Sequence, residues 1–168
     1  MYPMTNIRRY FAEGQINFLT HVTYNRIPIL TDNIDLFWDA YKYSCGKNGA
    51  NLIAWVVLPD HAHLLINPAG NNLSNLTKLF KLKFSGLYRS KHHLLKGRIW
   101  QYRYWDHIIR DQSDLNRHID YIHYNPVKHR IVGNPRHYEH SSMGKYLDSY
   151  PVDWGLGEEI DLEGDFGE

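Results

Sequence analysis

Alternation of apolar and polar residues indicates the strands of this chain. Gln15–Tyr24 alternates closely enough to predict a strand, and Ile99–Arg110 is rich in the aromatic and β-branched residues that strands favour. Leu52–Leu58 is a continuous apolar run, which is typical of a buried strand. Pro59-Asp60 predicts a turn after it, and His61–Ile66 predicts its hairpin partner. The pattern therefore predicts four strands.

Apolar residues at helical spacing predict three helices between and after these strands. Asp32–Lys47 and Leu73–His92 show this spacing, and the second segment is long and amphipathic. A third helix is expected over Asp111–Tyr124, with Asp111 or Ser113 as its N-cap. Asn125-Pro126 is expected to close it, because the residue before a proline disfavours α-helical geometry.

The order of these elements is β-α-β-β-α-β-α. Its first six members match the ferredoxin-like βαββαβ sandwich, an α+β fold with one antiparallel sheet and helices on one face. We expect residues 1–150 to form this domain, completed by the C-terminal helix, and residues 151–168 to form an acidic, mobile tail. The fold alone decides no function, so function must be argued from individual residues.

Composition narrows the class of protein. With 43% hydrophobic and 22% charged residues, the chain is neither disordered nor fibrous. No apolar run reaches about 18 residues, so we expect no membrane span. The single cysteine, Cys45, excludes an internal disulfide framework and a cysteine-based zinc site. We therefore expect a protein of the reducing cytoplasm.

The net charge of +1 results from an acidic C-terminal segment and a basic remainder of the chain. Residues 152–168 hold seven acidic and no basic side chains, so the remainder carries +8. No acid lies between Asp60 and Asp106, where cations alternate with aromatic rings. This mixture suits nucleic acid, although a solvated helix face above core aromatics would also explain it. The candidate DNA contacts are Arg8, Arg9, Lys78, Lys81, Lys83, Arg89, Lys91, Arg98 and Arg103.

The acidic tail itself has two interpretations. It could compete with DNA for the basic groove, in which case a chain truncated near Tyr150 should bind DNA more tightly. The alternative is a disordered segment that only keeps the protein soluble.

Two histidines, His61 and His63, flank Ala62 on a predicted strand. Strand side chains alternate with period two, so both imidazoles leave the same face of the sheet. Paired imidazoles suit a divalent metal. The alternative is coincidence in a chain that contains 11 histidines.

Tyr121 and Asn125 lie four residues apart on the last predicted helix and so share one face. An amide oxygen is a hard ligand suited to Mg²⁺ or Mn²⁺, and a phenol can attack phosphorus. His118, one turn before Tyr121, is the candidate basic neighbour that could help to activate the phenol without binding the metal itself. The alternative places Tyr121 in the core and makes Asn125 a helix cap.

Together these side chains predict a phosphodiester-cleaving site. Two imidazoles and one amide leave metal positions open for phosphate oxygens and water. Attack by Tyr121 would give a covalent phosphotyrosine and a free hydroxyl. This bond conserves the energy of the phosphodiester, so the strand could be rejoined to another end without ATP.

Two segments carry a family resemblance. Trp55–Ile66, WVVLPDHAHLLI, looks like the strand pair of the single-tyrosine transposases that bears the HUH motif, histidine-hydrophobic-histidine. Tyr121–Val132, YIHYNPVKHRIV, resembles the nucleophile helix of the same family. Arg8–Thr20 and Ile99–Asp111 are also similar to it, and the Asn-Pro pair is most similar to the REP-associated branch, whose members are tied to short palindromic DNA repeats. The resemblance covers roughly residues 7–145.

The resemblance implies a role for each matching residue. His61, His63 and Asn125 would hold Mg²⁺ or Mn²⁺, and Tyr121 would be the nucleophile. The substrate would be single-stranded DNA beside an imperfect hairpin, cut to a 5′-phosphotyrosine and a 3′-hydroxyl. The family includes dimers with exchanged helices and also monomers. A second phenol, Tyr124, is available nearby but lies about 300° round the helix from Tyr121.

Two other functions stay open at this point. A ferredoxin-like module that binds single-stranded nucleic acid without cutting it explains the aromatics and the charge, but not the four site residues. A degenerate transposase retained as a binder of palindromic repeats explains the family resemblance. Metal binding separates the enzyme from the first alternative, and formation of a covalent adduct separates it from the second.

Overall fold

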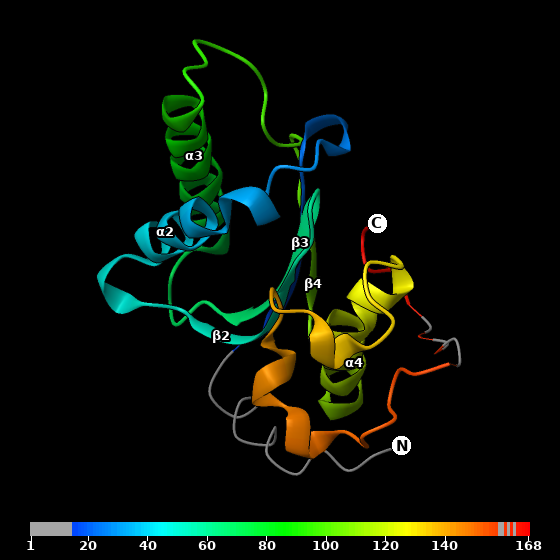
Figure 1. Ribbon diagram of the computed structural model, residues 1–168. Helices are drawn as coiled ribbons and strands as arrows, with labels where there is room; N and C mark the ends of the chain where they lie inside the picture. The colour runs from blue at the N-terminus through cyan, green and yellow to red at the C-terminus, as the bar shows by residue number, and fades with distance from the viewer. Residues whose placement is uncertain (1–14, 158–159, 161, 163) are drawn as a thin grey trace.

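The computed structural model describes residues 15–157, 160, 162 and 164–168. Its centre is one antiparallel sheet in the order β2-β3-β1-β4 (Figure 1). The strands are β1 (Asn17–Val22), β2 (Asn51–Val57), β3 (His61–Asn67) and β4 (Trp105–Ile108). With two helices between these strands, the predicted ferredoxin-like α+β fold is confirmed.

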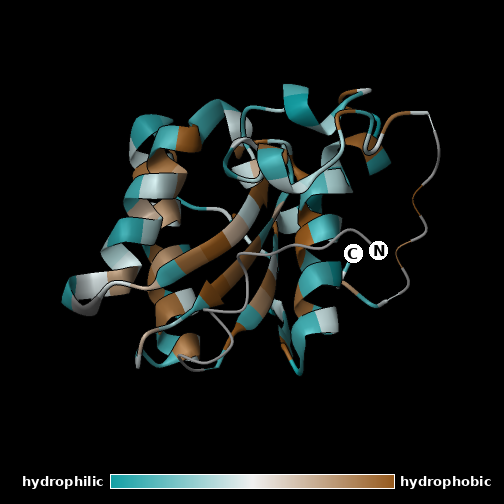
Figure 2. Cartoon of the chain, turned by 90° about the horizontal axis from the view of Figure 1, so that it is seen from below, coloured by the Kyte–Doolittle hydropathy of each residue, from teal (hydrophilic) through white to brown (hydrophobic). Residues whose placement is uncertain are grey.

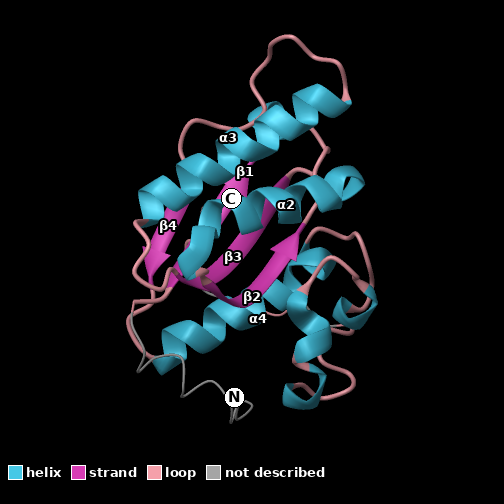
Figure 3. Ribbon diagram, turned by 90° about the vertical axis from the view of Figure 1, so that its left-hand side faces the viewer, coloured by secondary structure: helices cyan, strands magenta, loops and turns pink. Residues whose placement is uncertain are grey.

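Helices cover both faces of the sheet. Helices α2 (Ile34–Cys45) and α3 (Leu73–Lys91) lie on one face, and α4 (Gln112–Lys128) lies on the other (Figures 1 and 3). Figure 2 shows apolar positions gathered along the strands between these helices. Phe37 and Phe80 belong to the core under α2 and α3. A second core lies under α4, so the sheet is buried on both sides.

The sheet directs alternate side chains of β3 to different cores. Ala62 and Leu64 pack under α2 and α3, whereas Leu65 packs under α4. His61 and His63 share the parity of Leu65 and therefore face α4. In the register with β1, His63 pairs with Thr20 and His61 pairs with Val22.

The last strand is shorter than the sequence predicts. It was expected over residues 99–110, but β4 covers Trp105–Ile108, preceded by an isolated bridge between Thr23 and Trp100. The ammonium group of Lys81 donates to the carbonyl oxygens of Gln101 (3.0 Å) and Arg103 (3.4 Å). These backbone acceptors are therefore used by a side chain instead of a neighbouring strand.

The last helix is longer than predicted. Asp111 is its N-cap as expected, but the helix continues through Asn125 and Pro126 to Lys128. The missing N–H of Pro126 costs little so close to the end of the helix. The carbonyl oxygens of the final turn accept from residues further on, with His129 N–H donating to Asn125 O (3.0 Å). The extra turn keeps Asn125 and Lys128 on the same rigid element as Tyr121.

Two further features bear on the properties of the chain. Cys45 is buried at the end of α2. Within the described ranges, no helix combines the length and the apolar character needed to cross a membrane.

Candidate active site

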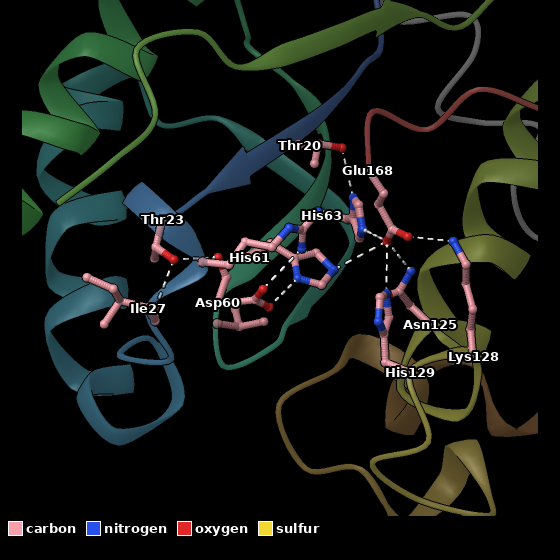
Figure 4. A network of polar contacts seen from close by, with 12 residues as sticks. Thr20, Thr23, Ile27, Asp60, His61, His63, Asn125, Lys128, His129 and Glu168 are labelled. Carbon is pink, nitrogen blue, oxygen red and sulfur yellow. Dashed lines mark hydrogen bonds and ion pairs between the residues drawn. The ribbon is translucent and has the colours of Figure 1, made fainter.

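Both histidines of the HUH motif point from β3 toward α4, with ring centroids 5.1 Å apart. The Asp60 carboxylate lies 2.6 Å from Nδ1 of His61 and also binds Arg26 at 3.0 Å (Figure 4). Burial opposes ionisation of Asp60, but these two partners lower its pKa to about 2. The ionised carboxylate orients the ring of His61 through Nδ1. Nε2 of His61 is buried and has no hydrogen-bond partner among the described residues.

The tautomer of His63 follows from its neighbours. The Thr20 hydroxyl donates its single proton to the carbonyl oxygen of Phe166 (2.7 Å). Nδ1 of His63, 2.8 Å from that hydroxyl, must therefore be the donor of the pair. Burial lowers the pKa of His63 to about 4, although the Glu168 carboxylate beside Nε2 acts in the opposite direction. Once that carboxylate leaves, the neutral ring with its proton on Nδ1 has its lone pair on Nε2. This nitrogen has the form that a metal ligand requires.

Helix α4 supplies the remaining groups from one face, at Tyr121, Asn125 and Lys128. The Tyr121 ring lies 5.2 Å from the His63 ring, and its hydroxyl accepts from Nζ of Lys128 at 3.0 Å. Asn125 is fully buried, and its Oδ1 has no hydrogen-bond partner among the described residues. The structure thus brings together the four site residues predicted from the sequence.

The donor set fits a divalent metal. Nε2 of His61 and Oδ1 of Asn125 are buried without hydrogen-bond partners in the described part of the chain. Nε2 of His63 faces the same place. Imidazole nitrogens with an amide oxygen accept Mg²⁺, Mn²⁺ and related ions.

A carboxylate from the acidic segment lies at the centre of this site. Oε1 of Glu168 is 2.8 Å from Nε2 of His63, 2.9 Å from Nδ2 of Asn125 and 3.3 Å from Nε2 of His61. His129 and Lys128 also contact the carboxylate (Figure 4). Residues 164–168 therefore occupy the space on which the expected metal ligands converge.

The same segment covers the phenol. The ring of Phe166 stacks on Tyr121, with centroids 3.7 Å apart and planes 7° apart. Burial raises the pKa of Tyr121 above its usual range, and the nearby Glu168 carboxylate raises it further. In this arrangement the phenol is a poor nucleophile, because its ionised form is disfavoured.

Sequence reasoning missed several of these contacts. Lys128 could have been found, because it follows Tyr121 at the i, i+7 spacing of one helix face. Asp60 was assigned only to a turn. Nothing in the acidic segment distinguishes Glu168 from its six acidic neighbours, and its role depends on tertiary packing.

The other phenol, Tyr124, lies away from the site, whereas His118 lies at its border. Tyr124 packs near Trp154, with centroids 6.1 Å apart, and its hydroxyl accepts from the backbone N–H of Ile160. Nδ1 of His118 lies 2.7 Å from the carbonyl oxygen of Asp114. The ring of His118 contacts Phe166, as the ring of Tyr121 does. His118 therefore borders the site beneath the bound segment.

The predicted DNA contacts divide into groups. Arg8 and Arg9 lie outside the described residues. Lys81 and Arg89 donate hydrogen bonds to backbone carbonyl oxygens of the segment that follows α3. Lys81 donates to Gln101, and Nε of Arg89 donates to Gly97 (3.2 Å). Lys83 and Lys91 lie beside other side chains, Lys83 over the ring of Tyr43 and Lys91 within 3.9 Å of Asp35. The exposed members of the set are Lys78, Lys91, Arg98 and Arg103.

Comparisons with known proteins identify the family of the chain. The family model "Transposase IS200 like" matches residues 15–125. A Haemophilus influenzae protein that carries the name REP-associated tyrosine transposase is 35% identical, covering 96% of this chain and 99% of its own. The REP-associated tyrosine transposase of Escherichia coli K12 is 31% identical, covering 90% of this chain and 91% of its own.

A solved structure is also similar. It is a REP-associated tyrosine transposase bound to a REP hairpin, with 30% identity and a TM-score of 0.72. The match covers 98% of this chain and 94% of that one. The fold and the sequence matches identify the same family. The chain belongs to the IS200-like family of single-tyrosine HUH transposases, in its REP-associated branch.

Proposed function

We propose that this protein is a metal-dependent endonuclease and strand transferase that cleaves single-stranded DNA next to a hairpin. The observation that carries the proposal is the position of the Tyr121 hydroxyl, bonded to Lys128 and beside the His63 ring. Nε2 of His61 and Oδ1 of Asn125, which are buried without a hydrogen-bond partner in the described part of the chain, lie at the same site. A core tyrosine and a helix-capping asparagine would require no such neighbours.

The proposed partner is hairpin DNA from palindromic repeats. The similar solved structure is bound to a REP hairpin, and the present chain matches it over almost its whole length. His61, His63 and Asn125 would hold Mg²⁺ or Mn²⁺. When bound, such an ion polarises the scissile phosphate and offsets its developing negative charge.

The protein's own groups account for the steps around the phosphorus. The Tyr121 oxygen loses its proton and attacks phosphorus, and the ammonium group of Lys128 stabilises the phenolate. The bond from phosphorus to the 3′ oxygen breaks, and that oxygen takes up a proton. The products are a 5′-phosphotyrosine and a 3′-hydroxyl, and the reverse attack by another 3′-hydroxyl rejoins the strands.

The test is covalent capture of labelled DNA. The protein is mixed with single-stranded hairpin oligonucleotides from palindromes flanking its gene, with Mn²⁺ or Mg²⁺, and run on a denaturing gel. We expect a band shifted by the mass of the DNA, lost with a chelator and in Tyr121→Phe. The matched control, Tyr124→Phe, should keep the band. A band that survives in Tyr121→Phe would contradict the assignment of the nucleophile.

The position of Glu168 favours a second candidate function. A chain whose site is filled by its own carboxylate could bind palindromic repeats without cutting them. Tight hairpin binding without any adduct, in the full chain and in a variant lacking residues 164–168, would favour this repeat-binding function over the transferase.

A further inference from the structure

We propose that Tyr24, Arg98 and Tyr102 form a base ledge, a surface on which an unpaired DNA base stacks beside the active site. The inference rests on the proposed function and adds the place where the protein holds the single strand. It concerns a part of the chain that none of the cleavage steps uses.

The three side chains form a layered stack. The guanidinium carbon of Arg98 lies 3.5 Å from the ring centroid of Tyr102 and 4.8 Å from that of Tyr24. Tyr102 is 84% exposed although Arg98 lies over one face of its ring, so the other face is open. A flat, open phenol next to a fixed cation is the surface on which nucleic-acid bases stack.

The hydrogen-bonding edge of Arg98 is also unused. In the described part of the chain, Arg98 makes no hydrogen bond and no ion pair, and its contacts are the two rings. Stacking fixes the plane of the guanidinium and leaves its N–H groups for an acceptor. Phosphate oxygens and base edges are the acceptors that such a planar donor recognises best.

The ledge is exposed but well braced. Arg89 holds the carbonyl oxygen of Gly97 on one side of Arg98. On the other side, Gln101 N–H donates to Val22 O (2.9 Å), and Tyr24 N–H donates to Ile99 O (2.8 Å). A surface that is already ordered loses little conformational entropy when it binds a ligand.

The base ledge lies at the active-site end of the sheet. Val22, which anchors Gln101, pairs with His61 in the β1–β3 register. Thr23 N–H donates to Asp60 O (2.9 Å), the residue that orients His61 (Figure 4). In Figure 1 the green segment that follows α3 descends to this end of the sheet, beside the blue turn that contains Tyr24. The ledge therefore lies beside the end of β3 that carries His61.

The turn between the ledge and the site has an uncommon backbone. Asn25 and Arg26 both lie in the left-handed region, at φ 53° and 52°. The backbone of a residue with a long side chain, such as Arg26, adopts this conformation only when other contacts hold it there. Its bond to Asp60 provides that contact and ties the turn to the orientation of His61.

The occupant that fits is one unpaired nucleotide. Bases inside a duplex already stack on both sides, so they have no free face for Tyr102. A base in a single-stranded extension has two free faces, and its phosphate can reach Arg98. The ledge should therefore distinguish a hairpin with an unpaired extension from the same hairpin without one.

The test measures binding of two fluorescently labelled DNA hairpins from palindromes flanking the gene, one with unpaired extensions and one without. A chelator is present so that no cleavage occurs. Tyr102→Ala should weaken binding of the extended hairpin about tenfold and leave binding of the other unchanged. Tyr102→Phe should keep wild-type affinity because it retains the ring. Tyr43→Ala is the matched control, since Tyr43 is also exposed beside a cation, Lys83, on another face.

The outcomes separate the ledge from the proposed function. Equal weakening of both hairpins by Tyr102→Ala, or no weakening of either, would overturn the ledge, whereas the Tyr121 adduct would still form. If the wild-type protein binds neither hairpin and forms no adduct, the proposed function fails and the ledge fails with it. Arg98→Lys keeps the charge but loses the planar stack, so the ledge predicts weaker binding of the extended hairpin only.

Discussion

At the scale of single residues, the site depends on side chains that orient its ligands. Asp60 binds Nδ1 of His61, and Thr20 accepts from Nδ1 of His63, so both rings direct Nε2 toward α4. Without such partners an imidazole can rotate or change tautomer. Orienting partners of this kind contribute strongly to metal affinity, although they never touch the metal.

Asp60→Asn tests this orienting role. The substitution keeps the shape of the side chain but removes the charge that holds Nδ1–H of His61. We expect affinity for Mn²⁺, measured by titration calorimetry, to fall about tenfold to a hundredfold. Asp35→Asn is the control, because Asp35 is an exposed carboxylate on α2. Equal Mn²⁺ affinity of wild type and Asp60→Asn would show that His61 needs no orienting carboxylate.

The residues predicted from the sequence are those fixed by local periodicity. His61 and His63 follow from the two-residue repeat of a strand, and Tyr121 with Asn125 follows from the helical turn. Asp60 and Glu168 could not be found in this way. Asp60 reaches His61 through a turn, and Glu168 reaches α4 through a segment that folds back from 40 residues further along the chain. Neither arrangement follows a periodic pattern in the sequence.

At the scale of elements, residues 164–168 and α4 form one closed arrangement. Phe166 stacks on Tyr121, and Glu168 fills the space between the histidines and Asn125. Between α4 and this part of the chain lies a cavity of about 790 Å³. The segment thus borders a hollow and enters the site through these two side chains, of which Phe166 also belongs to the core under α4.

Glu168→Gln should open the site. Charge-assisted hydrogen bonds contribute about 1.5–3 kcal/mol each, so loss of the carboxylate should raise the rate of adduct formation about tenfold or more. A variant lacking residues 164–168 also loses the Phe166 stack and should react faster still. Both rates are measured from adduct bands at a fixed metal concentration.

The control for this prediction is Glu139→Gln. Glu139 is an exposed glutamate outside the site, so its charge can be removed without touching the bound segment. The prediction is wrong if both tail variants react at the wild-type rate, or if Glu139→Gln accelerates the reaction equally.

The ends of α4 and β4 could not be predicted from the residues next to them in the sequence. Proline chemistry predicted that the last helix would stop before Pro126, yet carbonyl partners beyond the proline let it continue to Lys128. Aromatic content predicted a strand from residue 99, yet Lys81 binds the backbone oxygens that a ladder would need. In both cases a partner outside the local window decided the boundary.

At the scale of the whole molecule, buried histidines couple stability to pH. Burial lowers the pKa of His21 and of His123 to about 3. In the unfolded chain both have an ordinary pKa near 6.5. Between these values the unfolded state binds more protons, so stability is present above about pH 6.5 and is lost as the pH falls toward 3.

We therefore expect the free energy of unfolding to fall between pH 7 and pH 5, by up to about 2 kcal/mol for each of the two histidines. Urea unfolding at the two pH values measures the difference. His123→Gln should remove the share of His123 from this pH dependence, up to about 2 kcal/mol, whatever its effect on absolute stability. His137→Gln, at an exposed position, should leave it unchanged. A wild-type protein equally stable at both pH values would contradict the prediction.

The overall architecture could be predicted because it depends only on the order of strands and helices and on the pattern of apolar and polar residues along the chain. The sequence β-α-β-β-α-β-α allows few ways to cover both faces of one sheet, and the ferredoxin-like order is confirmed. What the order could not predict is how the acidic segment returns to α4. That path depends on the fit of Phe166 and Glu168 into a site that exists only after folding.

The burial of Cys45 has a practical consequence. The chain has one thiol, and it lies in the core under α2. A cysteine introduced at an exposed position, such as Leu95 in the segment after α3, would be the thiol that a maleimide dye reaches in the folded protein. Fluorophores could therefore be attached at chosen points of the native sequence without removing a cysteine first. Such labels would allow the approach of DNA to the protein to be followed in real time.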